Sequence, residues 1–417
     1  MANNEKTVYV YADWSEDQPV LMGRLFVSVG RGKELFSFEY SKDWLKSTSS
    51  GIAFDPDLHL YEGRQYAPDK PVFGVFSDSC PDRWGRLLMK RREAILAREE
   101  NRKPRALTEI DCLLGVFDEI RLGALRFSLG EGKPFLSSDK DLCIPPWTTL
   151  RALESASLAF EHDDNGREEK WLVQLLAPGS SLGGARPKAS VLAPDGSLWI
   201  AKFPSKSDEW NSGAWEIIVH DLAVKCELNV PQAKLETFSE TGGTFLVKRF
   251  DRMKSRRIHF TSAMALLGKT DGDTDTASYL DIAAFIKSNG ASPKQDLREL
   301  WKRIVFSIAV SNTDDHLRNH GFLLADQGWR LSPMYDVNPN IYGNALSLNI
   351  STDDSSANFD LAVETAQYYY VDIRDAKNMV ENIKKTVSEN WRTLASGYGL
   401  SRSAINRMEP AFIMEYK

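Results

Sequence analysis

The sequence predicts an α+β fold, because three regions of the chain differ in the periodicity of their apolar residues. Residues 6–40 alternate apolar and polar side chains between glycine and aspartate breaks, a pattern typical of a β-meander. Residues 171–250 contain short apolar runs that indicate strands around one long helix, and the pattern from about residue 260 onward is mainly helical. We therefore expect a β-rich start, a small mixed region and a helical remainder.

Local signals place the elements in order. Helical spacing of apolar residues predicts three helices, over residues 83–99, 148–162 and 212–228. Strand-like runs cover residues 121–127, 195–203, 234–240, 244–250 and 330–336. Two prolines make residues 141–150 a linker. The expected organisation is a first region over 1–150, a second over 151–252 and a third over 253–417.

Composition restricts the class of protein. The chain has 417 residues, is 42% hydrophobic and 26% charged, and carries a formal net charge of -6, so it is not a polycation built for nucleic acid. No apolar run approaches the ~20 residues that span a bilayer, and the N-terminus lacks the pattern of a secretory signal. The four cysteines form no C-x-x-C pair. We expect a cytoplasmic protein that does not bind membranes.

Residues 311–320, Ser-Asn-Thr-Asp-Asp-His-Leu-Arg-Asn-His, place polar and ionisable side chains between two apolar segments, 300–310 and 321–324. Burying such groups is costly unless they are paired or do chemistry. We expect a loop that lies in a cleft and is braced by buried elements on both sides.

Five polar residues occur in the order that protein kinases use. Lys202 lies in a strand-like run, and Glu216 lies in the following helix. Asp314 opens a D-x-x-x-x-N motif that Asn319 closes, and Asp336 is expected at the end of a strand. Kinases place a strand lysine, a helix glutamate, an Asp–Asn pair and a metal-binding Asp in this order.

These residue types suit phosphoryl transfer, which depends mainly on positioning and on neutralising charge. Lys202 would neutralise phosphate oxygens and Glu216 would hold that lysine. Mg²⁺ prefers oxygen ligands, which Asn319 and Asp336 supply. Asp314 would accept the proton of an attacking hydroxyl.

Residues 179–191, Gly-Ser-Ser-Leu-Gly-Gly-Ala-Arg-Pro-Lys-Ala-Ser-Val, resemble a phosphate-binding loop. Gly183 and Gly184 would let backbone N–H groups approach phosphates, although the motif is neither G-x-G-x-x-G nor a Walker A. Lys188 would add positive charge. Ser180 and Ser181 are candidate phosphate acceptors.

A metal-hydrolase interpretation competes for the same polar stretch. Asp314, Asp315, His316 and His320 are metal-ligating types, and the histidines have the spacing of the ends of H-E-x-x-H. The motif's glutamate is missing, so phosphoryl transfer is favoured.

Several motifs together resemble the HipA family, the serine/threonine kinase toxins of bacterial toxin–antitoxin pairs. The motifs are S-N-T-D-D-H-L-R-N (311–319), L-S-P-M-Y-D (331–336), G-G-A-R-P-K-A-S (183–190), V-K-R-F-D-R (247–252) and R-I-H-F-T-S-A-M-A-L-L-G (257–268). Residues 81–88 and 121–127 are similar to the family's N-terminal subdomain, so the resemblance covers nearly the whole chain. It implies a protein-kinase-like, two-lobed fold with a β-rich N-terminal subdomain, a small ATP-binding lobe and a helical lobe.

The resemblance also implies roles for individual residues. It makes Asp314 the catalytic aspartate with His316 beside it, and Asn319 and Asp336 the Mg²⁺ ligands. It makes Lys202 the lysine that binds the ATP phosphates, and it makes the backbone around Lys248 and Phe250 the hinge that holds adenine. It points to autophosphorylation on Ser181, although adjacent Ser180 leaves the choice open. Lys248 stands where an acidic residue is expected, which matters little if the backbone recognises adenine.

Partners follow from the resemblance as well. Family members pair with a HipB-like helix-turn-helix antitoxin that binds operator DNA, and they phosphorylate translation components such as aminoacyl-tRNA synthetases. Residues 83–105 contain nine Arg or Lys and three Glu. This basic segment could face DNA phosphates in such a complex, or it could simply be a solvated helix face; the solvated face is favoured. The alternatives to a kinase toxin are a catalytically silent corepressor and a small-molecule kinase.

Overall fold

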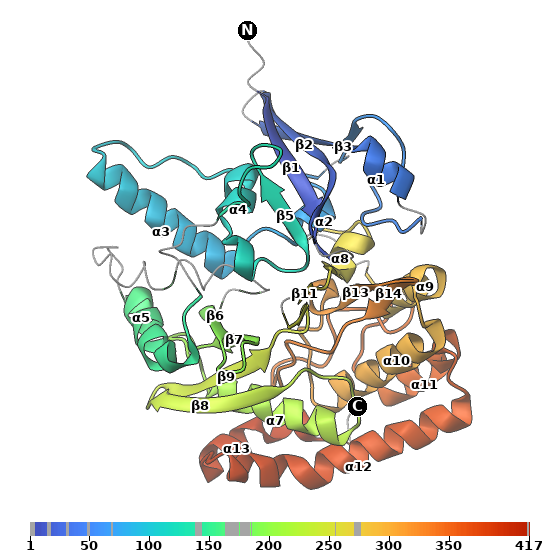
Figure 1. Ribbon diagram of the computed structural model, residues 1–417. Helices are drawn as coiled ribbons and strands as arrows, with labels where there is room; N and C mark the ends of the chain where they lie inside the picture. Colours follow the sequence, from blue (N-terminus) through green and yellow to red (C-terminus); the bar gives the residue numbers. More distant parts are fainter. Residues whose placement is uncertain are drawn as a thin grey trace. The chain divides into compact units, whose positions relative to one another are not determined.

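The computed structural model describes residues 5–14, 18–30, 33–47, 51–67, 70–137, 144–162, 175, 184, 186–254, 256–270, 277–414 and 417 (Figure 1). The chain divides into two compact units. Unit 1 comprises Met1–Lys206 and Lys248–Thr261, and unit 2 comprises Ser207–Val247 and Ser262–Lys417. The finer division at residues 150 and 252 stays a prediction.

Unit 1 begins with an antiparallel five-stranded sheet in the order β4-β3-β2-β1-β5. Its strands are β1 (Lys6–Ala12), β2 (Val20–Gly30), β3 (Lys33–Tyr40), β4 (Gln65–Tyr66) and β5 (Leu125–Ser128). Alternate side chains of β1, Val8, Val10 and Ala12, are buried, as the period of a half-buried strand requires. The predicted β-meander over residues 6–40 is confirmed (Figure 1, blue).

The other elements of unit 1 are mostly helices and short hairpins. The helices are α1 (Lys42–Ser47), α2 (Gly74–Ser77), α3 (Arg83–Glu99), α4 (Glu109–Gly115), η1 (Asp118–Ile120), η3 (Trp147–Thr149) and α5 (Leu150–His162). The strands β6 (Lys188–Leu192) and β7 (Leu198–Lys202) pair antiparallel, as do β10 (Arg252–Met253) and β11 (Arg256–Arg257). Helix α3 starts where Asp82 accepts a hydrogen bond from the Gly85 N–H at 2.7 Å, a standard N-cap.

Unit 2 is mainly helical. Its helices are α7 (Ser212–Lys225), α8 (Ala263–Leu266), α9 (Tyr279–Asn289), α10 (Pro293–Ala309), η5 (Leu317–Asn319), α11 (Phe359–Thr365), η6 (Ala366–Tyr369), α12 (Ile373–Gly397), α13 (Arg402–Met408) and η7 (Glu409–Phe412). Helix α12 packs against α7 and α10, and the C-terminal half of α10 is almost wholly buried (Figure 1). This buried helix supports the polar stretch that follows it.

Two antiparallel hairpins belong to the same unit. They are formed by β8 (Ala233–Ser239) with β9 (Gly242–Lys248), and by β13 (Gly321–Ala325) with β14 (Gly328–Leu331); the short strand β12 (Phe260–Ser262) spans the boundary of the two units. Helix α7 passes so close to β9 that a Cβ on Gly213 would lie 2.0 Å from the Gly243 carbonyl oxygen. Only glycine fits at this crossing.

One predicted strand end is wrong. We expected Asp336 at the end of a strand, but β14 ends at Leu331 and no regular structure covers residues 332–340. Pro333 lacks an N–H for a strand ladder, and Asp336 has a φ of +57°, which interrupts extended backbone. The aspartate is therefore held by a loop.

Candidate catalytic site

Helix α10 ends directly before the polar stretch 311–320. Ser311 adopts a φ of +52°, a left-handed conformation of the kind that terminates helices, and its hydroxyl donates to the Ala411 carbonyl at 3.0 Å. After this turn, Asn312 and Thr313 are buried, whereas Asp314 is exposed. The loop thus presents the carboxylate of Asp314 while its neighbours anchor the backbone.

Asp315, next to Asp314, is buried at the centre of a polar network that the sequence did not reveal. Its Oδ2 accepts hydrogen bonds from the Tyr279 hydroxyl at 2.6 Å and the Ser307 hydroxyl at 3.3 Å, and its Oδ1 lies 3.1 Å from His320 Nε2. Burial would raise the pKa of Asp315, but the charge and hydrogen bond of His320, with the two hydroxyls, hold it below its usual range. This carboxylate fixes the loop and is not available to a ligand.

The amide of Asn319 is oriented by the same loop. Its Nδ2 donates to the Asp314 backbone carbonyl at 2.9 Å, so the amide oxygen is the group left to accept or to bind a cation. Asn319 is 7% exposed and closes the short helix η5. His316 lies half-buried at the start of η5, and its Nδ1 has no hydrogen-bond partner within the described residues.

The segment around Asp336 is tied to this loop on both sides. Tyr335 donates its hydroxyl hydrogen to the Arg318 carbonyl at 2.8 Å, and the Asn338 N–H donates to Asn312 Oδ1 at 3.2 Å. Asp336 itself is half-buried and strained by its positive φ. These hydrogen bonds bring the residue predicted to bind Mg²⁺ to the loop that carries Asp314 and Asn319.

Glu216 is the remaining predicted site residue of unit 2. It lies in the second turn of α7 and is 6% exposed. The helix is positioned by Asn211, whose side-chain oxygen accepts hydrogen bonds from the N–H groups of Ala214 at 3.2 Å and Gly243 at 2.9 Å. A single amide therefore caps α7 and fastens it to β9.

The predicted ATP residues Lys202 and Lys188 lie in unit 1. Lys202 is the last residue of β7, half-buried, and stands directly opposite Lys188 in the antiparallel pair. Lys188 is 2% exposed, and its ammonium donates to Asp82 Oδ2 at 2.7 Å. Asp82 thus neutralises one of two facing lysines, a role that its position before a helix did not reveal. The pairing of Lys202 with Glu216 stays a prediction.

The hinge expected at Lys248 and Phe250 is braced by buried charges. Arg249 binds Asp251 through an ion pair of 2.6 Å, and Asp251 also accepts from the Gly123 N–H at 2.8 Å. Burial would raise the pKa of Asp251, but the neighbouring arginines hold it far below its usual range. The segment is therefore fixed to the loop that precedes β5, while adenine binding at this hinge stays a prediction.

The glycine loop is described only in part. Gly184 has a φ of +96°, which favours glycine, and its carbonyl accepts a hydrogen bond from Lys188 Nζ at 3.3 Å. Gly183, Ser180 and Ser181 lie outside the described residues, so the predicted phosphate contacts and autophosphorylation site stay predictions.

The metal-hydrolase alternative finds little support in the geometry. His320 and Asp315 interact with each other, and η5 separates His316 from His320, so the i, i+4 spacing does not lie on an α-helix. Within the part of the chain that the structure describes, no three His, Cys, Asp or Glu side chains converge as a metal site. Oxygen ligands for Mg²⁺ from Asn319 and Asp336 remain compatible with the loop.

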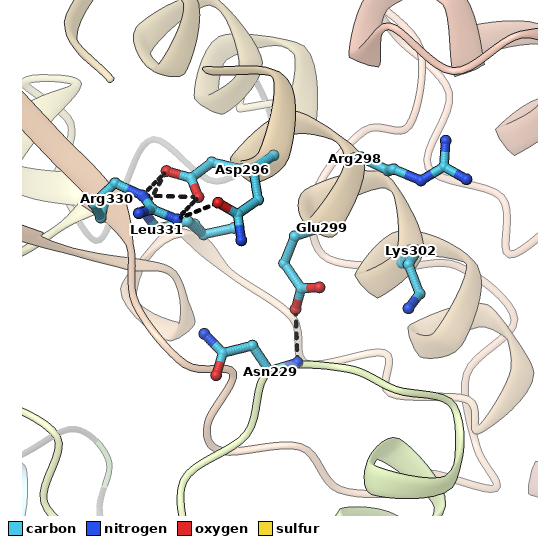
Figure 2. Close-up of a pocket in the computed structure, with 8 residues that line it drawn as sticks. Asn229, Asp296, Arg298, Glu299, Lys302, Arg330 and Leu331 are labelled. Atoms are coloured by element: carbon cyan, nitrogen blue, oxygen red, sulfur yellow. Dashed lines mark hydrogen bonds and ion pairs between the residues drawn. The ribbon is translucent and has the colours of Figure 1, made fainter. Parts of the chain in front are cut away.

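A cavity of about 460 Å³ in unit 2 lies elsewhere (Figure 2). Arg330 forms an ion pair with Asp296 at 3.0 Å, and Glu299 accepts a hydrogen bond from the Asn229 N–H at 3.0 Å. The other residues that line the cavity are Gln295, Arg298, Lys302 and Leu331. None of these is a predicted site residue, and the charged groups at its wall brace α10 against β14.

The basic segment 83–105 is partly neutralised within unit 1. Arg86 pairs with Glu109 and Arg105 with Asp111, each at 2.7 Å, and Arg102 pairs with Glu93. Such pairing supports the favoured interpretation, a solvated basic face.

Among the described residues, no helix is long and apolar enough to cross a membrane.

Comparison with known proteins adds the family. Residues 180–391 match the family model of the HipA-like C-terminal domain. Over 182 residues the chain is 29% identical to a protein named "Putative kinase Y4mE" from Sinorhizobium fredii, covering 38% of this chain and 41% of the relative. It is 33% identical over 182 residues to a protein named "Putative kinase" from Haemophilus influenzae, covering 38% of this chain and 52% of the relative. The chain thus spans about half the length of the curated relatives it matches.

The fold is also found among solved structures. The HipA chain in a structure described as the Shewanella oneidensis MR-1 HipA, HipB and operator DNA complex superposes with a TM-score of 0.69. The similarity covers 97% of this chain and 94% of that chain, at 15% sequence identity, and so shows the fold. The family model covers just over half of the chain, which therefore belongs to the HipA-like family and has its α+β, kinase-like fold. The fold and the family predicted from the motifs are both confirmed.

Proposed function

We propose that this protein is an ATP- and Mg²⁺-dependent serine/threonine protein kinase, the toxin of a HipBA-like pair. The observation that carries the proposal is the arrangement of the 311–319 loop, in which Asp314 is exposed while the Asn319 amide is turned by its hydrogen bond to the Asp314 carbonyl. The hydrogen bonds on either side of Asp336 hold a second oxygen donor beside this loop. The kinase names of the curated relatives agree with this assignment.

The residues of unit 2 then have separate roles. The Asp314 carboxylate accepts the proton of the substrate hydroxyl as the hydroxyl oxygen bonds to the γ-phosphorus of ATP, and the bond to the bridging oxygen breaks to release ADP. Asn319 and Asp336 would hold Mg²⁺, which when bound neutralises charge on the phosphate oxygens. Asp315 keeps the Asp314 backbone in place through its buried network.

Unit 1 would supply the nucleotide contacts. Lys202 would neutralise phosphate oxygens, with Glu216 as its expected partner, and the backbone at Lys248 and Phe250 would hold adenine. Lys188 is bound to Asp82, which makes it a support for the glycine loop through its hydrogen bond to Gly184. Transfer to Ser181 or Ser180 would add about -1.5 to -2 charges to the loop and oppose ATP binding.

Partners and targets follow the family. The solved relative is bound to HipB and operator DNA, which supports a HipB-like helix-turn-helix antitoxin as partner, with DNA reached only through that complex. A translation component, such as an aminoacyl-tRNA synthetase, is the proposed protein substrate.

The test is label transfer from γ-labelled ATP to the purified full chain, with the phosphate mapped by mass spectrometry. We expect label on Ser180 or Ser181 that requires Mg²⁺, is lost in Asp336→Asn and is retained in Asp353→Asn, which alters an exposed aspartate. Absence of label from protein verified to be unphosphorylated would refute the proposal and favour the corepressor.

A further inference from the structure

An exposed aromatic side chain lies on the loop that follows Asp336. Tyr342 is 68% exposed, yet its hydroxyl donates to Glu209 Oε2 at 2.7 Å and its N–H donates to Asn340 Oδ1 at 2.9 Å. The ring centroid of Trp210 lies 6.1 Å from that of Tyr342. Ordering an exposed side chain costs conformational entropy, and these contacts offset that cost for Tyr342.

Arg407, from α13, completes the group. Its guanidinium lies 5.8 Å from the Trp210 ring centroid and donates to Glu209 Oε2 at 3.1 Å and to the Glu209 carbonyl at 3.2 Å. We call Glu209, Trp210, Tyr342 and Arg407 the aromatic platform. Three separate segments of unit 2 contribute to it, so the two rings have a defined position.

The aromatic platform is connected to the catalytic loop. The Asn340 N–H donates to the Ser311 carbonyl at 3.0 Å, and its side-chain amide donates to Thr313 Oγ1 at 2.7 Å. A Cβ on Gly343 would lie 3.0 Å from Thr313, so the loop packs directly on the residue before Asp314. Tyr342 precedes Gly343 and Asp314 follows Thr313, so this contact keeps the Tyr342 ring within about 20 Å of Asp314.

A distance within this bound can be spanned by a short polypeptide segment. Four residues in an extended conformation span about 13 Å. A substrate whose hydroxyl is at Asp314 would therefore bring a side chain a few residues away onto the platform. A rigid pair of aromatic rings offers a large apolar contact area to such a side chain at little further entropic cost.

The charge of the platform indicates what it would bind. Glu209 is neutralised by Arg407 and also accepts the Tyr342 hydrogen bond, so the platform has no net charge. Nucleic acid binding relies on basic groups that neutralise phosphates, and the arginine here is already paired. An apolar or aromatic side chain of a polypeptide fits this surface better than a phosphate or a charged side chain.

We propose that the aromatic platform docks the acceptor segment of a protein substrate, holding an apolar side chain a few residues from the phosphorylated serine or threonine. This inference rests on the proposed kinase function. It makes Tyr342 a specificity residue, distinct from the groups that bind ATP.

The experiment uses the full chain, MgATP and an arrayed library of peptides with one central serine, in which one flanking position is varied at a time. Wild type is expected to prefer Leu, Phe or Tyr at one position within about five residues of the serine. Tyr342→Ala is expected to remove this preference and to raise the KM for the preferred peptide about tenfold, with an unchanged KM for ATP. Tyr342→Phe keeps the ring and should keep the preference.

Tyr368→Ala is the matched control, because Tyr368 is similarly exposed, at 56%, and lies on η6. The proposal is overturned if Tyr342→Ala retains the wild-type preference and peptide KM, if Tyr368→Ala loses them equally, or if wild type selects charged positions. Loss of binding to labelled single-stranded RNA in Tyr342→Ala, with peptide KM intact, would identify a nucleic acid platform instead. If wild type transfers no phosphate to peptides or to itself, both the proposed kinase function and this proposal are refuted. If wild type transfers phosphate but Tyr342→Ala has the same peptide preference and KM, only the docking proposal is refuted.

Discussion

Removing the Tyr279 hydroxyl tests the buried network that fixes the 311–320 loop. Tyr279 is fully buried, and its hydroxyl supplies the shortest hydrogen bond to Asp315, at 2.6 Å. Burial and the adjacent carboxylate raise the pKa of Tyr279 well above its ordinary value, so the group remains a donor at every working pH. In Tyr279→Phe, Asp315 keeps Ser307 and His320 as partners.

The expected cost follows from that change. A hydrogen bond to a charged group contributes about 1.5–3 kcal/mol, so Tyr279→Phe should lower the free energy of unfolding by about 2 kcal/mol. Tyr369→Phe is the matched control, because Tyr369 is also fully buried but its hydroxyl has no hydrogen-bond partner in the described part of the chain. Because a buried hydroxyl without a partner carries a desolvation cost of about 1–3 kcal/mol, Tyr369→Phe should leave the free energy of unfolding unchanged or raise it by up to that amount.

Urea unfolding of both variants measures the difference, and hydrogen-exchange mass spectrometry locates it. We expect faster exchange in peptides that cover residues 307–320 of Tyr279→Phe, with Tyr369→Phe unchanged there. Equal stability of the two variants, or unaltered exchange in this loop, would show that the hydroxyl does not hold Asp315 in place.

Three further predictions concern folding. Burial lowers the pKa of His259 to about 3, so between that value and about 6.5 only the unfolded chain binds a proton at this residue. The free energy of unfolding should therefore fall by about 1.4 kcal/mol for each pH unit below 6.5, and urea titrations at pH 7, 6 and 5 should show that His259→Gln loses this slope. Gly213→Ala places a methyl group against the backbone of β9 and should lower the free energy of unfolding by about 3 kcal/mol or prevent folding. Gly397→Ala, where the added methyl group meets open space, should be neutral or stabilising by up to about 1 kcal/mol, and equal melting temperatures of the two variants would contradict this. Asp82→Ala removes the carboxylate that binds the buried Lys188 ammonium and should cost about 3–5 kcal/mol. Most of this loss should be recovered when Lys188→Met is added, and an unrecovered loss would assign it to the α3 cap instead.

Much of the fold could be predicted from local patterns. The alternation in β1 to β3 and the helical spacing of residues 83–99 lie in continuous segments whose periods reflect burial, and α3 spans the predicted residues. The predicted strand end at Asp336 was wrong, because a run of apolar letters around Pro333 does not reveal a loop held by contacts from elsewhere. Of the β13–β14 hairpin, only β14 overlaps a predicted strand, the run over residues 330–336, and β13 was not predicted.

The candidate site was predictable to the extent that its chemistry requires particular residue types in a fixed order. Asp314, Asn319 and Asp336 were predicted in this way, and their roles stay predictions. The residues that hold the loop in place, such as Tyr279 and Asn340, could not be predicted, because they belong to no motif in the sequence. They gain their roles through contacts with residues 27 to 36 positions away. Asp315 appeared to be an alternative metal ligand until its neighbours were known.

The measurement that tests the central claim most directly is the single-turnover rate of phosphate transfer from MgATP in wild type, Asp314→Asn and Asp353→Asn. General-base catalysis contributes about 10²–10⁴-fold, so Asp314→Asn should be at least a hundredfold slower while its affinity for ATP is retained. Asp353→Asn should match wild type. A rate for Asp314→Asn within threefold of wild type would contradict the account, because the exposed aspartate of the 311–319 loop would then not be the catalytic base.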